Sequence, residues 1–175
     1  MLGHIITGNC VKMDPDKVSA IEAWTQPTTV NQIQKFLGLC GYYRKFIKNF
    51  SKIAALPYNL LKAEVKWNWT PECDSAFIEL KRRLVTYPIL RNPNFNQEFI
   101  IHTNASGVAL GAVLAQSDES GEYVCHYASR LLKGSELHYR ITEKECLAIV
   151  WAIQHFKVYI YGVPFTIVTD HAALQ

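Results

Sequence analysis

The sequence lacks several features that would define a secreted, membrane-bound or zinc-binding protein. It contains no run of about eighteen apolar residues, so no membrane-spanning helix is expected. Its N-terminus has no basic segment followed by an apolar run, so no secretory signal is predicted. The five cysteines are widely spaced and form no C-x-x-C pair, which argues against a zinc site or a disulfide framework. We therefore expect reduced thiols in an intracellular protein, cytoplasmic or nuclear, with no membrane partner.

The sequence also has little excess of positive over negative charge, because the net charge is only +3. The cations are nevertheless clustered. One cluster consists of Lys35, Arg44, Lys45, Lys48 and Lys52, and the other of Lys81, Arg82 and Arg83. Such clusters contact nucleic-acid phosphates, or else they form a solvated helix face. Charge alone leaves both interpretations open.

The first 90 residues predict a β-hairpin followed by helices. His4–Thr7 and Cys10–Met13 flank Gly8-Asn9, a pair that suits the positive φ angles of a tight turn. Asp14-Pro15 then predicts a helix start, with an aspartate N-cap and a proline in the first turn.

Two longer helices are predicted in the same part of the chain. Thr29 and Gln32 match a capping box, and apolar residues at helical spacing follow as far as Ile47. Thr70-Pro71 starts the second of these helices, and Tyr87-Pro88 stops it.

The pattern changes after residues 91–97, which are rich in asparagine and proline. We interpret this segment as a linker between two domains, 1–90 and 98–175. Beyond it the sequence predicts strands over Glu98–Asn104, Gly111–Gln116 and Glu122–Ser129, a helix over Thr142–Tyr159, and a strand over Phe165–Thr169. Three strands, a helix and another strand predict an α/β domain with a mixed sheet, so the whole chain is expected to be α+β.

Short motifs occur in a fixed order along nearly the whole chain. Those of the first half include Leu2–Ile6, Asp14–Val18, Phe36–Leu39 and Tyr42–Ile47. Those of the second half are Thr103–Ser106, Gly111–Gln116, Tyr127–Arg130, Thr142–Ile149 and Val168–His171. Together they resemble the polymerase polyprotein of gypsy-type LTR retrotransposons, which are retrovirus-like elements. The first half resembles the reverse transcriptase thumb and connection, and the second half resembles the RNase H-like domain.

The resemblance implies a nuclease site in which carboxylates hold two Mg²⁺ or Mn²⁺ ions. Glu145 and Asp170 match the second and third carboxylate positions and are the candidate metal ligands. Asn104 stands at the first position, where the family has aspartate. Asparagine is nearly the same size but neutral, so the fold should survive while metal affinity falls. The fourth carboxylate belongs to a later segment, so the RNase H-like domain is expected to be incomplete at its C-terminus.

Both carboxylates also have structural interpretations. Thr142-x-x-Glu145 matches a capping box, in which Glu145 would accept a hydrogen bond from the Thr142 backbone. Asp170 could cap the turn that follows its strand. Glu143 is expected to be solvated. The resemblance favours the metal-ligand interpretation for Glu145 and Asp170.

A nucleic-acid-binding surface is predicted for one helix, which the resemblance assigns to the thumb, beside the primer–template duplex. Its candidate residues are Tyr42, Tyr43, Arg44, Lys45 and Lys48. Binding through the phosphate backbone would be independent of sequence and sensitive to salt. At least two of the three residues Tyr43, Phe46 and Ile47 are expected to belong to the hydrophobic core instead.

The leading interpretation is a fragment of a retroelement reverse transcriptase/RNase H with an impaired nuclease, whose polymerase aspartates would precede Met1. The parent activities would be those of an RNA-directed DNA polymerase and an RNA–DNA hybrid ribonuclease. Its partners would be an RNA/DNA hybrid or primer–template duplex and the remainder of the polyprotein. The alternative is a domesticated, non-catalytic module that binds nucleic acid or protein. A third interpretation is an active element of which this sequence is only a part.

Overall fold

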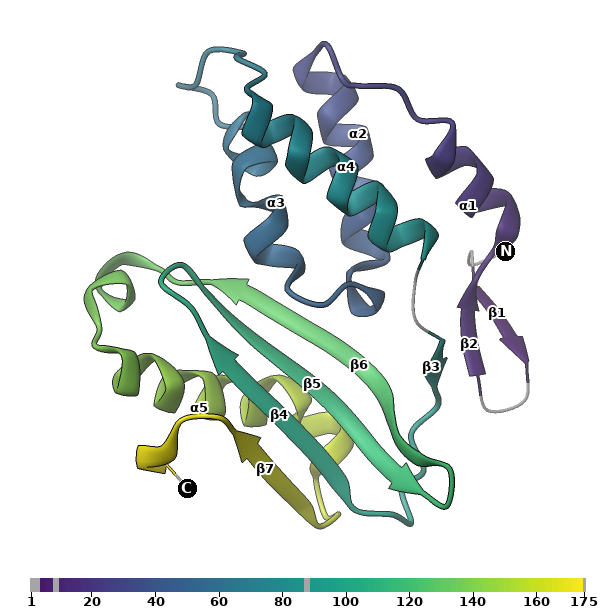
Figure 1. Ribbon diagram of the computed structural model, residues 1–175, viewed down its shortest axis with the longest axis vertical. Helices are drawn as coiled ribbons and strands as arrows, with labels where there is room; N and C mark the ends of the chain where they lie inside the picture. Colours follow the sequence, from purple (N-terminus) through teal and green to yellow (C-terminus); the bar gives the residue numbers. More distant parts are fainter. Residues whose placement is uncertain (1–3, 8–9, 87–88, 175) are drawn as a thin grey trace.

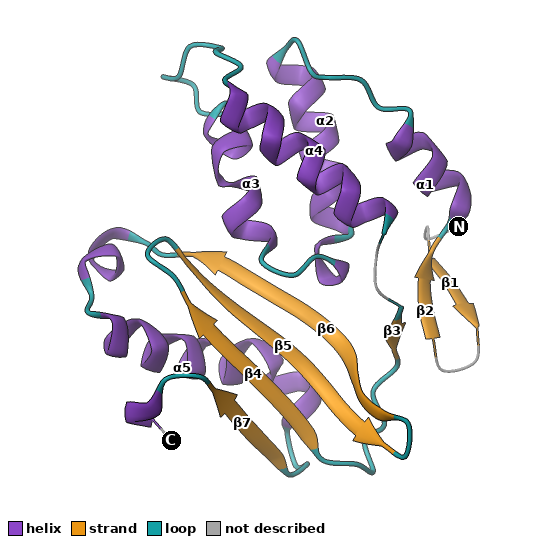
Figure 2. Cartoon of the chain, in the orientation of Figure 1, coloured by secondary structure: helices purple, strands orange, loops and turns teal. Residues whose placement is uncertain are grey.

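The computed structural model describes residues 4–7, 10–86 and 89–174 (Figure 1). The helices of residues 15–85 gather at one end of the molecule and a four-stranded sheet lies at the other, with a small three-stranded sheet beside them (Figure 2). In the small sheet, β1 (His4–Thr7) pairs antiparallel with β2 (Cys10–Met13), which confirms the predicted hairpin strands. Their predicted turn, Gly8-Asn9, lies outside the described residues. Strand β3 (Leu90–Arg91) pairs with the other side of β2.

The helical region contains α1 (Pro15–Glu22), α2 (Val30–Tyr42), α3 (Phe50–Asn59) and α4 (Pro71–Val85). The predicted N-caps Asp14, Thr29 and Thr70 each accept a hydrogen bond from a backbone N–H in the first turn, at 3.0–3.4 Å. The reciprocal half of the Thr29 capping box does not form. Instead, Gln32 Oε1 accepts a hydrogen bond from the backbone N–H of Thr28 at 2.7 Å.

The helix that follows the Thr29 cap was predicted to continue to Ile47, and this prediction was wrong. Helix α2 ends at Tyr42, and a 3₁₀ turn, η1 (Arg44–Phe46), follows it. Asn49 then adopts a left-handed conformation with φ of 59°, which turns the chain into α3. Side chains three residues apart share a face in a 3₁₀ turn as well as in an α-helix, so apolar spacing could not locate the helix end.

The four-stranded sheet consists of β4 (Phe99–Ala105), β5 (Ala109–Asp118), β6 (Gly121–Leu131) and β7 (Phe165–Thr169). Its strand order is β6-β5-β4-β7, with β4 and β7 parallel and the other neighbours antiparallel. This arrangement confirms the predicted mixed sheet.

Helix α5 (Ile141–Ile160) covers one face of this sheet. Its buried residues Ala148, Ala152, Phe156 and Ile160 recur every four positions and so form one stripe along the helix. Phe99 and Ile101 lie two positions apart on β4, so both side chains point toward that stripe, and both are fully buried. None of the helices in the described part of the chain combines the length and apolar character needed to cross a membrane.

Two reciprocal hydrogen bonds join the helical region to the sheet. The Ser51 backbone N–H donates to Ser129 Oγ at 2.9 Å, and Ser51 Oγ donates to the Ser129 carbonyl at 2.9 Å. Ser51 lies in the first turn of α3, and Ser129 lies on β6, which is one of the two edge strands of the sheet. The chain segment before α3 is therefore fixed against the sheet.

Residues 91–97, interpreted above as a linker, are held to the sheet by one fully buried side chain. Gln116 Nε2 donates to the carbonyls of Asn94 and Gln97 at 2.8 and 3.1 Å. Gln116 Oε1 accepts from the Asn94 backbone N–H at 2.8 Å. The division of the chain into domains 1–90 and 98–175 stays a prediction.

Replacing Gln116 with leucine should strongly destabilise the protein. Leucine fills a similar volume but removes three hydrogen bonds to the backbone of Asn94 and Gln97, so we expect the free energy of unfolding to fall by about 1–3 kcal/mol. Urea unfolding followed by circular dichroism measures this change. The control is Gln154→Leu, on the exposed side of α5. Equal stabilities of the two variants would contradict the structural role of Gln116.

Between the sheet and α5, the His126 ring packs 5.7 Å from the Phe156 ring, measured between centroids. Burial lowers the pKa of His126, and the neighbouring His155 and nearby cations add to this effect, so that the pKa is about 4. An unfolded histidine has a pKa of about 6.5, so the folded state binds fewer protons below that pH. The stability that neutral His126 provides is therefore complete above about pH 6.5 and is lost as the pH falls toward 4.

A pH titration of stability tests this assignment. Lowering the pH from about 7 to about 5 should reduce the free energy of unfolding by on the order of 1–2 kcal/mol through His126 alone. The His126→Gln variant should lose this part of the pH dependence, whereas His138→Gln, at an exposed position, should keep it. The assignment fails if His126→Gln and the unaltered protein respond equally to acid.

Candidate functional site

Asn104 and Asp170 lie at neighbouring strand ends. Strands β4 and β7 run parallel with Thr103 opposite Thr169, so the residues that follow this pair come out at the same edge of the sheet. Asn104 and Asp170 both line a hollow of about 210 Å³, here called the Asn104 hollow. The structure thus brings together two of the three positions predicted for the nuclease site.

Glu145 lies beside this hollow, in the first turns of α5, and does not line it. Its side chain is only 4% exposed, and Oε1 accepts a hydrogen bond from the Ala105 backbone N–H at 3.1 Å. Within the described residues, Oε2 has no hydrogen-bond partner. Burial raises the pKa of Glu145, and the negative charge of Asp170 raises it further. Asp170 is therefore close enough for its charge to act on the Glu145 carboxyl group.

The capping role considered for Glu145 is wrong. Helix α5 begins one residue before the predicted start, at Ile141, so the residue three positions into the helix is Glu143. The Glu143 carboxylate accepts the Arg140 backbone N–H at 2.7 Å while its side chain stays exposed. Thr142 Oγ1 lies 2.9 Å from His171 Nε2 instead.

The donor set around the Asn104 hollow does not fit a pair of divalent ions. Two Mg²⁺ ions require a cluster of anionic oxygens, and Asn104 supplies a neutral amide. No group of three or more histidine, cysteine, aspartate or glutamate side chains is arranged to hold a metal ion anywhere in the described ranges. Lys48 also lines the hollow and adds a positive charge there.

The helical region covers the Asn104 hollow, which the sequence did not predict. Lys48 and Asn49 line the hollow from the segment between η1 and α3. Asn49 lies over Gly111 of β5, where an added Cβ would be 2.9 Å from Asn49 Oδ1. Asparagine tolerates the left-handed conformation found at Asn49, and this tolerance was the only local signal for the turn.

The five predicted nucleic-acid-binding residues do not share one helix, because α2 ends before Arg44. Tyr43 is only 1% exposed and belongs to the core with Phe46 and Ile47, so its predicted role at the surface was wrong. Tyr42 is 50% exposed, and Arg44 and Lys48 are also exposed. These three side chains lie at the surface of the molecule.

Lys45 and Lys81 have largely structural environments. Lys45 is half-buried with its Nζ 5.2 Å from the Phe46 ring centroid, and burial lowers its pKa. Lys81 Nζ donates hydrogen bonds to the carbonyls of Glu22 and Trp24 at 2.9 and 2.7 Å. Arg82 and Arg83 both pair with Glu79. They also line a second hollow of about 320 Å³ that Lys48 shares.

Comparison with known proteins gives sequence relatives along nearly the whole chain. The Pol polyprotein from transposon 297 of Drosophila melanogaster is 43% identical over 175 residues, which is 99% of this chain and 16% of that protein. The Pol polyprotein from transposon 412 of the same species is 41% identical over 173 residues, 99% of this chain and 14% of that protein. The Tf2-3 polyprotein of Schizosaccharomyces pombe is 36% identical over 163 residues, 91% of this chain and 12% of that protein. The chain thus spans less than a fifth of each of these relatives.

Solved structures give the same fold. The foamy viral protease–reverse transcriptase in complex with an RNA/DNA hybrid matches with a TM-score of 0.81 at 23% identity, covering 98% of this chain and 23% of that chain. The foamy viral protease–reverse transcriptase in complex with double-stranded DNA matches with a TM-score of 0.80 at 21% identity, covering 98% of this chain and 37% of that chain. At these identities the likeness establishes the fold alone.

A family model also matches the chain, over residues 69–167, which is more than half of its length. That model describes the RNase H-like domain found in reverse transcriptase. The match agrees with the transposon Pol polyproteins among the relatives. The chain therefore belongs to the family of RNase H-like domains found in reverse transcriptases.

Proposed function

We propose that this chain is the part of a retroelement polymerase polyprotein that holds an RNA/DNA hybrid or primer–template duplex, and that its nuclease site is impaired. The observation that carries the proposal is the neutral Asn104 beside Asp170 in a hollow that also contains Lys48. The transposon relatives and the foamy viral complexes with nucleic acid support the choice of partner.

The electrostatics of the hollow support impairment. In the family, two Mg²⁺ or Mn²⁺ ions would supply an activated water and stabilise the leaving oxygen. Asn104 removes one negative charge, Lys48 adds a positive one, and the free oxygen of Glu145 is buried away from the hollow. Each of these features weakens the attraction of a divalent cation. For this reason no cleavage step is assigned to this chain.

Nucleic-acid binding does not require the metal site. Tyr42, Arg44 and Lys48 are exposed on the segment before α3. Lys48 lines both the Asn104 hollow and the hollow that Arg82 and Arg83 share. Cations at this position would contact phosphates without reading bases, so affinity would depend on salt and not on sequence.

A second candidate function is that of a domesticated, non-catalytic binding or interaction module. The poor fit of the donor set to metal ions favours it as much as it favours an impaired enzyme. Cleavage and binding assays distinguish the two candidates from an active nuclease.

The nuclease part is tested by restoring the missing charge. Asn104→Asp should strengthen Mn²⁺ binding about tenfold or more, since one added charge at about 4 Å contributes several kcal/mol at an effective dielectric of about 20. Isothermal titration calorimetry measures this change, and Asn31→Asp, exposed on α2, adds the same charge elsewhere as a control. The unaltered chain should cleave a labelled RNA/DNA hybrid no faster than Glu145→Ala. Mg²⁺-dependent cleavage that Glu145→Ala abolishes would overturn the proposed impairment.

The binding part is tested with Lys48→Gln. Loss of one phosphate contact should weaken hybrid binding about 3- to 10-fold and reduce the slope of log K against log salt by about 0.9. Fluorescence anisotropy of a labelled hybrid over a salt series measures both quantities. The control is Lys62→Gln, an exposed lysine after α3. Unchanged affinity and slope in Lys48→Gln would rule out a phosphate contact at this lysine.

A further inference from the structure

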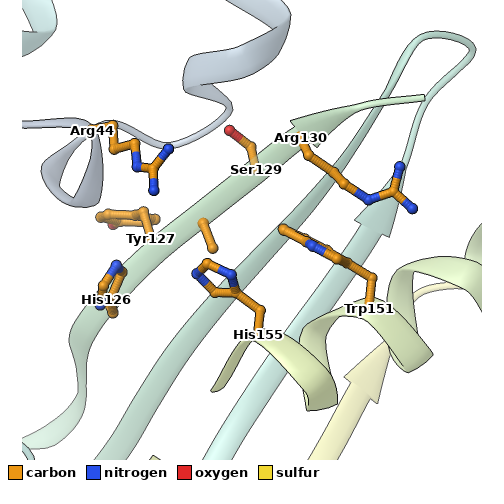
Figure 3. A pocket seen from close by; sticks show the side chains of 8 residues that line it. Arg44, His126, Tyr127, Ser129, Arg130, Trp151 and His155 are labelled. Atoms are coloured by element: carbon orange, nitrogen blue, oxygen red, sulfur yellow. The ribbon is translucent and has the colours of Figure 1, made fainter. Parts of the chain in front are cut away.

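A separate hollow of about 200 Å³ lies at the outer edge of the sheet, where η1, β6 and α5 meet (Figure 3). Its walls are aromatic rings and cations, and the residues used below are Arg44, His126, Tyr127, Arg130, Trp151 and His155. We call it the β6-edge hollow. None of the predicted nuclease positions lines it.

One wall of the β6-edge hollow is made of flat rings. Trp151 and His155 lie one turn apart on α5, with ring centroids 5.4 Å apart and planes inclined by 35°. The His126 ring lies 6.1 Å from that of His155. Burial lowers the pKa of both histidines, and the positive charge of Arg44 lowers them further. Both imidazoles therefore favour the neutral form at pH 7 and can present an uncharged aromatic ring to a ligand.

The opposite wall carries an available cation. Arg44 extends from η1 toward the hollow, and its guanidinium has no ion-pair partner among the described residues (Figure 3). Arg130 differs, because Glu136 holds it with two hydrogen bonds of 2.6 and 3.0 Å. The charge of Arg130 is therefore neutralised by Glu136, and Arg44 supplies the positive charge that can pair with an anion.

The strand between these walls offers backbone hydrogen-bonding groups. Ser129 turns its carbonyl away from β5, since it accepts the bond from Ser51 Oγ. Backbone groups alternate sides along an antiparallel strand, so the N–H and C=O of Tyr127 turn to the same outer edge. A donor and an acceptor side by side match the edge of a nucleobase.

From these features we infer that the β6-edge hollow binds one nucleotide of a single-stranded nucleic acid. The base stacks on Trp151 and His155, and its phosphate pairs with Arg44. Stacking platforms combined with cations are the usual means of binding single strands. Ligand pockets for drug-sized molecules span about 300–1,000 Å³, so a hollow of about 200 Å³ accepts a single ring system. A duplex keeps its bases paired and stacked, so stacking on Trp151 and His155 distinguishes this inference from the hybrid binding proposed above, although both use Arg44.

The test uses a short fluorescein-labelled oligothymidylate and anisotropy over a salt series. Trp151→Leu should weaken binding roughly 5- to 100-fold with an unchanged salt slope, because stacking is lost but no phosphate contact. Arg44→Gln should weaken it about tenfold and reduce the slope by about 0.7, the value for one phosphate on a single strand. The matched controls are Tyr161→Leu, an aromatic residue of 91% exposure after α5, and Lys62→Gln.

Two further measurements use the unaltered protein, so a misfolded variant cannot affect them. They locate the binding site and identify the ligand. Photocross-linking of an oligonucleotide containing 5-iododeoxyuridine should label the peptide that carries Trp151 and His155. Thymidine monophosphate should compete far more weakly than the oligonucleotide, since it has no neighbouring phosphates. Labelling elsewhere, or an Arg44→Gln variant that behaves like Lys62→Gln, would overturn the inference. Equal affinity for thymidine monophosphate would make the free nucleotide, and not a strand, the ligand.

Discussion

The contact between Ser51 and Ser129 determines which cations reach the Asn104 hollow and the β6-edge hollow. Its two hydrogen bonds tie the first turn of α3 to the outer strand β6. The chain just before α3 must then pass over the sheet, which brings Lys48 and Asn49 to the Asn104 hollow. The turn that precedes them brings Arg44 to the β6-edge hollow. One anchoring contact therefore positions the cations of both sites.

Within the sheet, the parallel pairing of β4 with β7 has a comparable effect on the carboxylate positions. Asn104 and Asp170 are 66 positions apart in sequence, yet the register that pairs Thr103 with Thr169 brings them to one edge. Glu145 reaches the same edge from α5 and bonds the backbone at Ala105. In the function proposed above, this edge is the scaffold of a carboxylate site, and Asn104 changes its charge. An amide at position 104 and a lysine across the hollow leave an environment better suited to an anionic phosphate than to a pair of cations.

Much of the architecture could be predicted from the sequence because it depends on local patterns. Alternation in β4 and the caps at Asp14, Thr29 and Thr70 each report on a few neighbouring residues. The errors arose where local patterns are degenerate. Apolar spacing could not distinguish the end of α2 from the 3₁₀ turn η1, so five candidate binding residues were assigned to one helix and Tyr43 to the surface. A one-residue shift in the start of α5 likewise transferred the capping role from Glu145 to Glu143.

By itself the sequence determined the order and type of most elements, the family motifs and the missing charge at Asn104, since these follow from residue identity and short-range spacing. The tertiary structure alone decided which distant groups meet. It buried Gln116 against residues 94 and 97, lowered the pKa of His126 by packing it against α5, and paired Ser51 with Ser129. Such contacts join residues far apart along the chain, and their energies depend on burial and on exact distances between atoms. No local pattern encodes those quantities, so both hollows and the cations that line them became visible only in the folded chain.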